Sequence, residues 1–403
     1  MPAYSATTDN FFDEQKEKSK VKTEIVINFL NIYLNIISNS KWTKGKDIYY
    51  IDLFSGPGVY KDGVSSTPIE IMNMLENMKD RVAANKVHLV FNDENREFVN
   101  CLNEKIRTHS YYKSIIHKPI ITNEHVCDFN LQPYLISGSP IFSFIDPWGY
   151  KDISTNLIWS LVKPIGSDCI LFFNSNRILQ DLSKPNHYDD MKDLFGVEYS
   201  NALSFQKNKE MRQNRKADLL LEFFIKNLYC KIKSEYSNYS KSYKLFALPF
   251  TFLKDDSVKT SHQIVLLTKN HKAILEMKKV MVKKSNNNAK EFMFDSKKVG
   301  YLSFFTREDD VSENFRKLIT DMLKIDKSLF NKTFTCESLL EYIDRYSMSV
   351  SFSVTSYTLN DVKKQIESLD NLGLIDVQDI EGKTIRKRIP DKREFKFSKK
   401  ILE

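Results

Sequence analysis

Apolar runs alternate with amphipathic stretches over the first two thirds of the chain. Five runs rich in β-branched and aromatic residues are almost continuously hydrophobic, as expected of strands buried on both faces of a sheet; they span residues 48–54, 87–91, 121–127, 141–145 and 169–173. Helical patterns separate several of them, at residues 69–77, 96–108 and 154–161. Strands alternating with helices predict an α/β fold with a doubly wound parallel sheet.

The segments around this alternation extend the same domain. An amphipathic helix over residues 11–38 should pack on the core, with a solvated lysine-rich first turn at residues 16–22. After the fifth strand a polar, mainly helical insertion spans residues 176–242, with its best helix at 215–233. Two further strands, 243–253 and 262–267, are joined closely enough to be antiparallel, and a helix at 273–282 follows. We therefore assign residues 1–46 to the N-terminal helix and 47–282 to the main domain.

A polar, asparagine-rich linker at residues 283–290 separates a smaller α+β module, residues 291–403. Its pattern predicts helices at 312–323, 337–347 and 359–369, then strands at 374–380 and 384–389 around a Glu381-Gly382 turn. Three helices followed by a hairpin is the order of a winged helix, a module that binds DNA or other proteins. Residues 383–400 contain nine basic residues and only two acids. We therefore expect any nucleic-acid contact at Arg386, Lys387 and Arg388.

Composition and charge exclude several classes of protein. The 403 residues are 41% hydrophobic, enough for two cores, and no apolar run approaches the length of a membrane span. The polar N-terminus lacks an export signal, so we expect a cytoplasmic protein. Five scattered cysteines without a C-x-x-C pair argue against disulfides or structural zinc, and we expect them to be buried and no metal to be bound. The net charge of +8 only weakly favours an anionic partner.

The end of the first strand carries the most informative motif, YIDLFSGPGVY at residues 50–60. The strand ends in Asp52, and Phe54, Gly56 and Gly58 form a turn at the sheet edge where open α/β sheets bind ligands. A P-loop would need Gly-Lys-Ser/Thr, which is absent, and a dinucleotide fingerprint would need glycine where Lys61 stands. The turn therefore predicts a site for an adenosine cofactor that lacks a pyrophosphate.

Acids close to the next two strands predict the rest of that site. Asp93, with Glu94 as its rival, follows the second strand, where a carboxylate can accept hydrogen bonds from both ribose hydroxyls. Asp128 follows the third strand and would reach the adenine amino group. Each acid could instead cap a helix. Because acids follow three successive strands, helix capping alone explains the pattern less well than a shared binding site.

The fourth strand ends in Asp146-Pro147-Trp148-Gly149-Tyr150, which resembles the Asp-Pro-Pro-Tyr loop of amino methyltransferases. The resemblance implies that Asp146 and Pro147 orient an acceptor amine while Trp148 or Tyr150 stacks on a base. Trp148 stands where the second proline would be, and Gly149 is extra. No Pro-Cys nucleophile follows the strand, which excludes cytosine-C5 chemistry. After the fifth strand, amides and Arg177 could bind phosphate or base or simply cap a helix, and His262 and His271 are mainly structural candidates.

Taken together, these motifs resemble the three-Cys-motif partner protein family over most of residues 11–282. The matching pieces are SKVK at 19–22, YIDLFSGPG at 50–58, SSTP at 65–68, FIDPWGY at 144–150 and Ser261-His262. The resemblance implies a class I methyltransferase-like, Rossmann-like core, a C-terminal winged helix, and a partner carrying the three-Cys motif that looks like a radical-SAM enzyme.

Two hypotheses follow. The first is an S-adenosylmethionine-dependent methyltransferase acting on nucleic acid, with a base turned out of its stack toward Asp146. The second is a non-catalytic adaptor with the same core, which docks the three-Cys-motif partner and presents it to nucleic acid. A nuclease is a weaker third reading, because the sequence shows no cluster of metal-binding carboxylates.

Overall fold

The computed structural model describes residues 15–235, 245–255, 259–286, 292–296, 307–378 and 393–402. The second half of the predicted linker, residues 287–290, lies outside these residues, as do the predicted Glu381-Gly382 turn, Arg386, Lys387 and Arg388.

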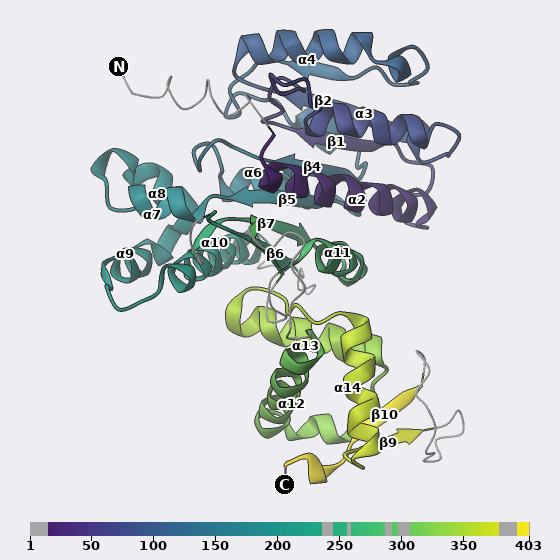
Figure 1. Ribbon diagram of the computed structural model, residues 1–403, viewed down its shortest axis with the longest axis vertical. Helices are drawn as coiled ribbons and strands as arrows, with labels where there is room; N and C mark the ends of the chain where they lie inside the picture. Colours follow the sequence, from purple (N-terminus) through teal and green to yellow (C-terminus); the bar gives the residue numbers. More distant parts are fainter. Residues whose placement is uncertain are drawn as a thin grey trace.

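An eight-stranded sheet in the order β3-β2-β1-β4-β5-β7-β6-β8 forms the centre of the larger part of the molecule (Figure 1). The first five strands are parallel, β7 runs antiparallel to both β5 and β6, and β8 is parallel to β6. The strands are β1 (Ile48–Asp52), β2 (Val87–Asn92), β3 (Ile120–Thr122), β4 (Ile141–Ile145), β5 (Asp168–Phe173), β6 (Phe246–Leu253), β7 (Thr260–Thr268) and β8 (Met293–Phe294). Strand order 3-2-1-4-5-7-6 with a reversed β7 is the class I methyltransferase-like arrangement, which confirms the predicted fold.

Helices cover both faces of the sheet. On one face α2 packs against α3 and α11, and α3 packs against α4; on the other face α6 and α10 lie together. The N-terminal helix presents Ile25, Phe29 and Leu30 to this core with exposed fractions of 1% or less. The bounds are α2 (Glu17–Asn39), α3 (Thr67–Asn77), α4 (Arg96–Thr108), α5 (Gln132–Ile136), α6 (Thr155–Val162), α7 (Ser175–Asp181), α8 (Tyr188–Phe195), α9 (Tyr199–Lys207), α10 (Gln213–Glu235) and α11 (His271–Lys284).

Three features differ from the sequence-based expectation. Strand β3 ends at Thr122, because residues 126–128 form a turn rather than continuing the strand. The two-residue strand β8 joins the edge of the large sheet through β6, although its sequence position had placed it in the C-terminal module. Finally, Val21 and Lys22 are buried, so the first turns of α2 are not simply solvated.

The C-terminal module contains α12 (Arg307–Ile325), α13 (Cys336–Ser351) and α14 (Leu359–Asn371), followed by β9 (Ile375–Gln378) and β10 (Glu394–Phe397). Strands β9 and β10 are antiparallel, and an isolated bridge joins Phe334 to Phe395. In the described residues β9 pairs with β10, and the predicted strand at 384–389 lies outside them. Helices, bridge and hairpin occur in winged-helix order; the winged-helix identity stays a prediction.

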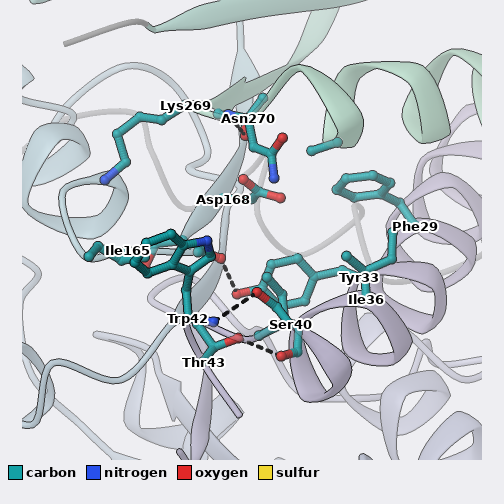
Figure 2. Close-up of a pocket in the computed structure, with 15 residues that line it drawn as sticks. Phe29, Tyr33, Ile36, Ser40, Trp42, Thr43, Ile165, Asp168, Lys269 and Asn270 are labelled. Carbon is teal, nitrogen blue, oxygen red and sulfur yellow. Dashed lines mark hydrogen bonds between the residues drawn. The ribbon is translucent and has the colours of Figure 1, made fainter.

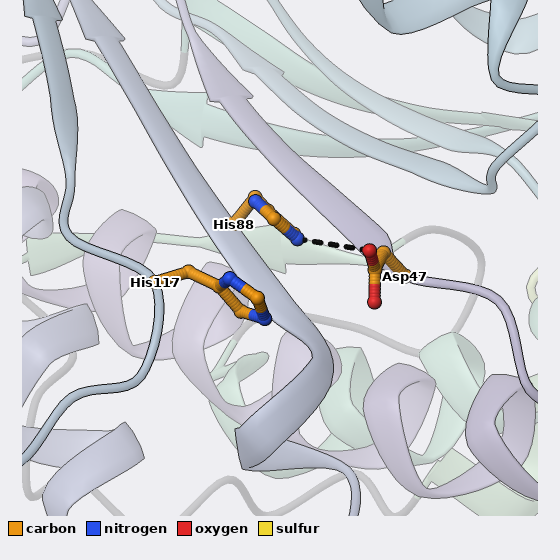
Figure 3. A group of neighbouring side chains, drawn as sticks. All are labelled: Asp47, His88 and His117. Atoms are coloured by element: carbon orange, nitrogen blue, oxygen red, sulfur yellow. Dashed lines mark ion pairs between the residues drawn. The ribbon is translucent and has the colours of Figure 1, made fainter.

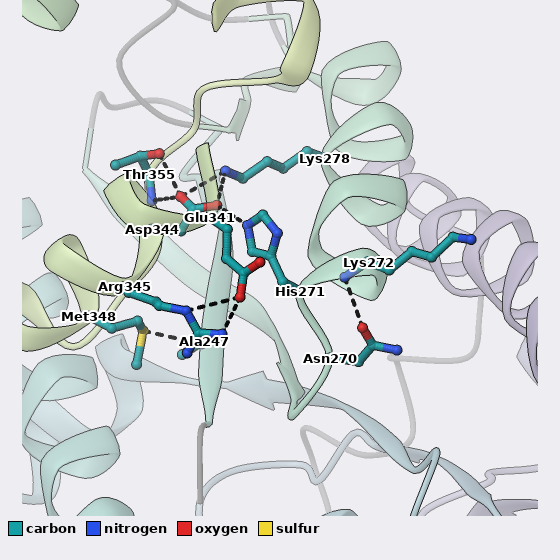
Figure 4. A network of polar contacts seen from close by, with 10 residues as sticks. All are labelled: Ala247, Asn270, His271, Lys272, Lys278, Glu341, Asp344, Arg345, Met348 and Thr355. Carbon is teal, nitrogen blue, oxygen red and sulfur yellow. Dashed lines mark hydrogen bonds and ion pairs between the residues drawn. The ribbon is translucent and has the colours of Figure 1, made fainter. Parts of the chain in front are cut away.

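The module packs against β6 and α11 through both apolar and polar contacts. Met348 and Val354 join the core of the sheet domain, and Leu275 of α11 joins the core of the module. The amide of Val354 donates to the carbonyl of Ala247 over 2.8 Å. At the centre of this junction Asp344 of α13 meets Lys278 and His271 of α11 (Figure 4).

Within the described residues, no helix is both long and apolar enough to cross a membrane. All five cysteines are free, as expected, and Cys169 and Cys336 are buried. Cys127 and Cys230 are exposed, however, and Cys101 is only partly buried, so the expectation that every cysteine is buried is wrong for these three.

Candidate functional site: a cleft at the carboxyl edge of the sheet

A cleft of about 370 Å³ lies where β1, β4 and β5 end and α2 and α3 begin. Its size falls within the range of small-molecule sites. The structure brings five of the predicted site residues together in its lining: Asp52, Phe54, Asp146, Pro147 and Trp148. Asp52 ends β1, and the other four residues lie in the loops after β1 and β4. Because these two strands are adjacent and parallel, their carboxyl ends lie at the same edge of the sheet.

Asp52 is the last residue of β1, and only 1% of it is exposed. Its Oδ1 accepts the amide of Phe54 over 3.1 Å, and its Oδ2 accepts the Tyr50 hydroxyl over 3.4 Å. Burial raises the pKa of Asp52 well above its ordinary value, and Asp146 and Asp93 raise it further. A cationic group of a ligand in the cleft would relieve this unfavourable charge.

The turn needs glycine because of the packing beneath it, and not because a ligand must approach its backbone from the cleft. Gly58 has a φ of +81°, and a Cβ there would lie 2.7 Å from Leu102 Cδ1 and 3.3 Å from Ile69 Cγ1. Gly56 also has a positive φ, 65°, and its amide donates to Asp93 Oδ2 over 2.8 Å. A side chain at Gly58 would therefore disturb the core under the turn, and both glycines shape the loop without lining the cleft.

The acids expected to hold the adenosine are placed differently. Asp93 is 7% exposed, and its two oxygens accept the amides of Gly56 and Asn95 over 2.8 and 2.9 Å. Burial raises its pKa. This carboxylate fixes the glycine turn, while Asp128 is exposed in a turn that is not part of strand β3. Neither acid belongs to the described lining of the cleft.

Asp146 forms an ion pair with Lys22 of α2 inside the cleft. The Asp146 side chain is 22% exposed and that of Lys22 only 9%. The Lys22 ammonium also lies 4.9 Å from the ring centre of Phe172, a favourable cation–π distance. Lys22 was part of a matched motif, but a lysine among several others at a helix start gave no sign that it alone would be buried.

The two aromatic residues of the Asp146 loop lie in different surroundings. Trp148 is 43% exposed and lines the cleft, where its ring can meet an incoming planar group. Tyr150 is 3% exposed, and its hydroxyl donates to Asp181 over 3.1 Å. A ring held in the core in this way cannot stack on a base, so Trp148 is the stacking candidate.

Several residues in the lining were not among the predicted site residues. Ser66 precedes α3 and is 6% exposed, and among the described residues its Oγ has no hydrogen-bond partner. His262 lies against Phe172 and Phe252; burial, then Lys22 and Lys18, lower its pKa well below the ordinary value. A neutral imidazole therefore faces the cleft. Asn174 also lines it, while its Oδ1 caps α7 by accepting the amide of Arg177, which supports the capping interpretation.

A second cavity, of about 260 Å³, lies at the opposite edge of the sheet (Figure 2). Phe29, Tyr33 and Trp42 surround it, and Asp168 at the start of β5 points into it. None of the predicted site residues that the structure describes lies there. We therefore place the candidate site at the carboxyl edge.

No family model and no curated protein matches the chain. A solved structure of a Legionella pneumophila protein of the DUF519 family covers 64% of this chain and 91% of its own, with 10% identity and a TM-score of 0.33. The methyltransferase domain of the bacterial protein CtHen1-C covers 60% of this chain and 98% of its own, also with 10% identity, and a TM-score of 0.27. Likeness at this level says nothing about ligands, and the fold assignment stands on the strand order.

Proposed function

We propose that the cleft binds S-adenosylmethionine and that the protein transfers its methyl group to nucleic acid. The observation that carries the proposal is the pairing of two complementary features in one cleft. A buried carboxylate, Asp52, faces it from β1, and Ser66 Oγ, a buried hydroxyl with no hydrogen-bond partner among the described residues, faces it beside the first turn of α3.

These features fit the amino-acid end of the cofactor. The N-terminus of a helix attracts anions, so the start of α3 and Ser66 Oγ suit its carboxylate. The raised pKa of Asp52, caused mainly by burial, shows a carboxylate that a cation would stabilise, and the cofactor carries an ammonium and a sulfonium. When bound, the sulfonium would supply the activated methyl group.

The remaining lining suits the acceptor. Trp148 offers an exposed ring for stacking, and Lys16 adds positive charge that would favour a phosphate-bearing substrate, while Lys18 and Lys22 are paired with Asp255 and Asp146. Asp146 would orient the acceptor amine, and His262, held neutral, could accept its proton. Methyl transfer depends mostly on position, so this alignment matters more than a strong base.

Calorimetry with S-adenosylmethionine tests the binding step. We expect Ser66→Ala and Asp52→Asn each to weaken binding about tenfold, because each leaves a polar group without its partner. Ser65→Ala is the matched control, since Ser65 does not belong to the described lining. No heat at millimolar cofactor would contradict the proposal. Transfer of labelled methyl groups to mixed DNA and RNA then tests the reaction.

The adaptor hypothesis is the second candidate, and one observation favours it. Asp146 already pairs with Lys22, and Tyr150 is buried against Asp181, so two residues expected to handle the acceptor have protein partners. In that case the core would bind the cofactor without turnover, and the C-terminal module would contact nucleic acid or the three-Cys-motif partner. Binding without methyl transfer, together with an Asp146→Asn protein that keeps its cellular role, would support the adaptor.

A further inference from the structure

A cluster of metal-ligating side chains that the proposed reaction does not use lies at the same carboxyl edge of the sheet as the cleft. His125 and Cys127 come from the loop after β3, Asp152 from the loop after β4, and Glu94 directly follows Asp93 after β2. The ligand atoms of His125, Cys127 and Asp152 all lie within 4.8 Å of one another. Sequence spacing gave no warning, because the ligands come from three separate loops rather than from a C-x-x-C motif.

Three distances within the cluster are close to those of a tetrahedral site. Cys127 Sγ lies 3.4 Å from Asp152 Oδ1, and His125 Nε2 lies 3.7 Å from Asp152 Oδ2. Glu94 Oε2 lies 3.6 Å from the same His125 nitrogen. Around a tetrahedral zinc ion, with bonds of about 2.0–2.3 Å, neighbouring ligand atoms are about 3.3–3.6 Å apart. Small shifts would therefore bring His125, Cys127 and Asp152 to this spacing, whereas the exposed Glu94 side chain, which is not part of the group within 4.8 Å, would have to turn further inward.

The surroundings of the cluster favour a cation. Asp128 and Asp190 add negative charge around the Cys127 thiol, beyond the charge of Asp152 itself. Asp152 adopts a φ of 67°, and the only other described non-glycine residue with positive φ is Phe352. This uncommon backbone conformation places one carboxylate between the thiol and the imidazole. The cluster is also open to solvent, since the His125 side chain is 46% exposed.

We propose that His125, Cys127 and Asp152, with Glu94 as fourth ligand, form a zinc site that ties together the loops after β2, β3 and β4. Soft thiolate and imidazole ligands with carboxylates select zinc over magnesium or calcium. On binding, the Cys127 thiol loses its proton to solvent and its sulfur bonds to the ion. The ion would fix the loops that carry Asp93, Asp128 and Asp146, whether or not the cleft binds S-adenosylmethionine.

A second group, Asp47, His88 and His117, lies at the opposite edge of the sheet but has the wrong geometry (Figure 3). The two imidazole rings are stacked, with centroids 3.7 Å apart and an interplanar angle of 23°. Lone pairs lie in the ring planes, so stacked rings direct them along nearly parallel lines rather than to a common point. His88 Nε2 lies 3.2 Å from Asp47 Oδ2.

Zinc titration of the tag-free full chain, stripped of metal beforehand, tests the proposal. We expect one zinc ion per chain at micromolar concentration, and at least tenfold weaker binding for Cys127→Ser and for His125→Ala. Cys230→Ser is the matched control, because Cys230 is also exposed but belongs to no cluster in the described residues. His117→Ala tests the rival group and should leave binding unchanged.

Cobalt substitution identifies the ligand directly. The wild type and Cys230→Ser should show the near-ultraviolet charge-transfer absorption of a thiolate bound to cobalt, and Cys127→Ser should lack it. Zinc should raise the Tm of the wild type but not of Cys127→Ser, whose metal-free Tm should match the metal-free wild type. Absence of stoichiometric zinc, equal binding by Cys127→Ser, or loss of binding in His117→Ala would each overturn the proposal.

Discussion

Two pairs of lysine and aspartate, one fully and one partly buried, differ in how many hydrogen bonds the aspartate accepts. At the junction of the two modules, Lys278 and Asp344 are both 0% exposed (Figure 4). Lys278 donates to both oxygens of Asp344, over 2.9 and 2.7 Å. His271 Nε2 adds a contact of 2.9 Å, and Thr355 donates its amide and its hydroxyl over 3.0 and 2.7 Å. This carboxylate is saturated.

The pair in the cleft, Lys22 and Asp146, is different. Its side chains are 9% and 22% exposed, and Lys22 is the partner that the described contacts give Asp146. Asp146 therefore retains acceptor capacity on the side facing the cleft. A saturated buried pair fixes the arrangement of two modules, whereas a pair with spare capacity beside a cavity can exchange a protein partner for a ligand.

The largest effect is expected at the junction. Burial acts to raise the pKa of Asp344, but Lys278 and His271 outweigh it and hold the pKa below its ordinary value. Asp344→Ala would leave the Lys278 ammonium buried without a counter-charge, so we expect the free energy of unfolding to fall by about 3–5 kcal/mol. Urea denaturation followed by circular dichroism measures this change.

Helix α11 supplies the control. Lys279 and Glu276 form a surface pair over 2.8 Å on the same helix, with the lysine side chain 57% exposed. Glu276→Ala should cost less than about 1 kcal/mol, because water replaces the lost contact. If Asp344→Ala costs no more than Glu276→Ala, the junction pair does not fix the modules and the contrast with the cleft fails.

Much of the fold, but less of the site, could be predicted from sequence. Continuous apolar runs marked β1, β4 and β5 to within two residues, and helix α4 matched its predicted bounds. Strand β3 was overextended because Val126 and Cys127 look strand-like, yet they lie in a turn. Strand β8 has only two residues, too few to give a periodic signal.

In the site, the strand ends correctly placed Asp52 and Asp146 at one edge, because that follows from parallel topology alone. The partners could not be predicted in the same way. Lys22 reaches Asp146 across 124 positions of sequence, and Tyr150 turns into the core toward Asp181. Such pairings depend on three-dimensional packing, which neither periodicity nor residue type records.

A third acid, Asp168, extends the comparison. It is buried, but fewer hydrogen-bond donors surround it than surround Asp344. Burial raises the pKa of Asp168 to about 7, and Thr268 and Lys269 only partly oppose it. The folded protein thus keeps this proton at pH values where the unfolded chain has lost it, so Asp168 stabilises the fold below about pH 4 and this contribution is lost as the pH rises through about 7.

Asp168→Asn keeps the shape and cannot ionise. Its free energy of unfolding, relative to the wild type, should increase between about pH 4 and 7 by up to about 4 kcal/mol and then stay level. Denaturant unfolding at a series of pH values measures this difference. Asp80→Asn, at an exposed surface acid, should show no such pH-dependent gain. A constant difference for Asp168→Asn across this range would show that Asp168 ionises as freely in the fold as in the unfolded chain.

The smallest effect on stability is expected at Lys22, and it tests the other half of the comparison. Lys22→Met keeps the apolar packing of the lysine stem, and the partly exposed Asp146 can regain water, so the free energy of unfolding should change by about 1 kcal/mol or less. The electrostatic effect of the same change on His262 should nonetheless be clear.

Lys22 is one of the charges that lower the pKa of His262, so its removal should raise that pKa toward the ordinary value. An NMR titration of the histidine ring protons follows the shift, and Lys20→Met, on the exposed side of the same helix, should leave His262 less affected. A loss of stability as large as that of Asp344→Ala would mean that the cleft pair is structural too, and that Asp146 is not available to a ligand.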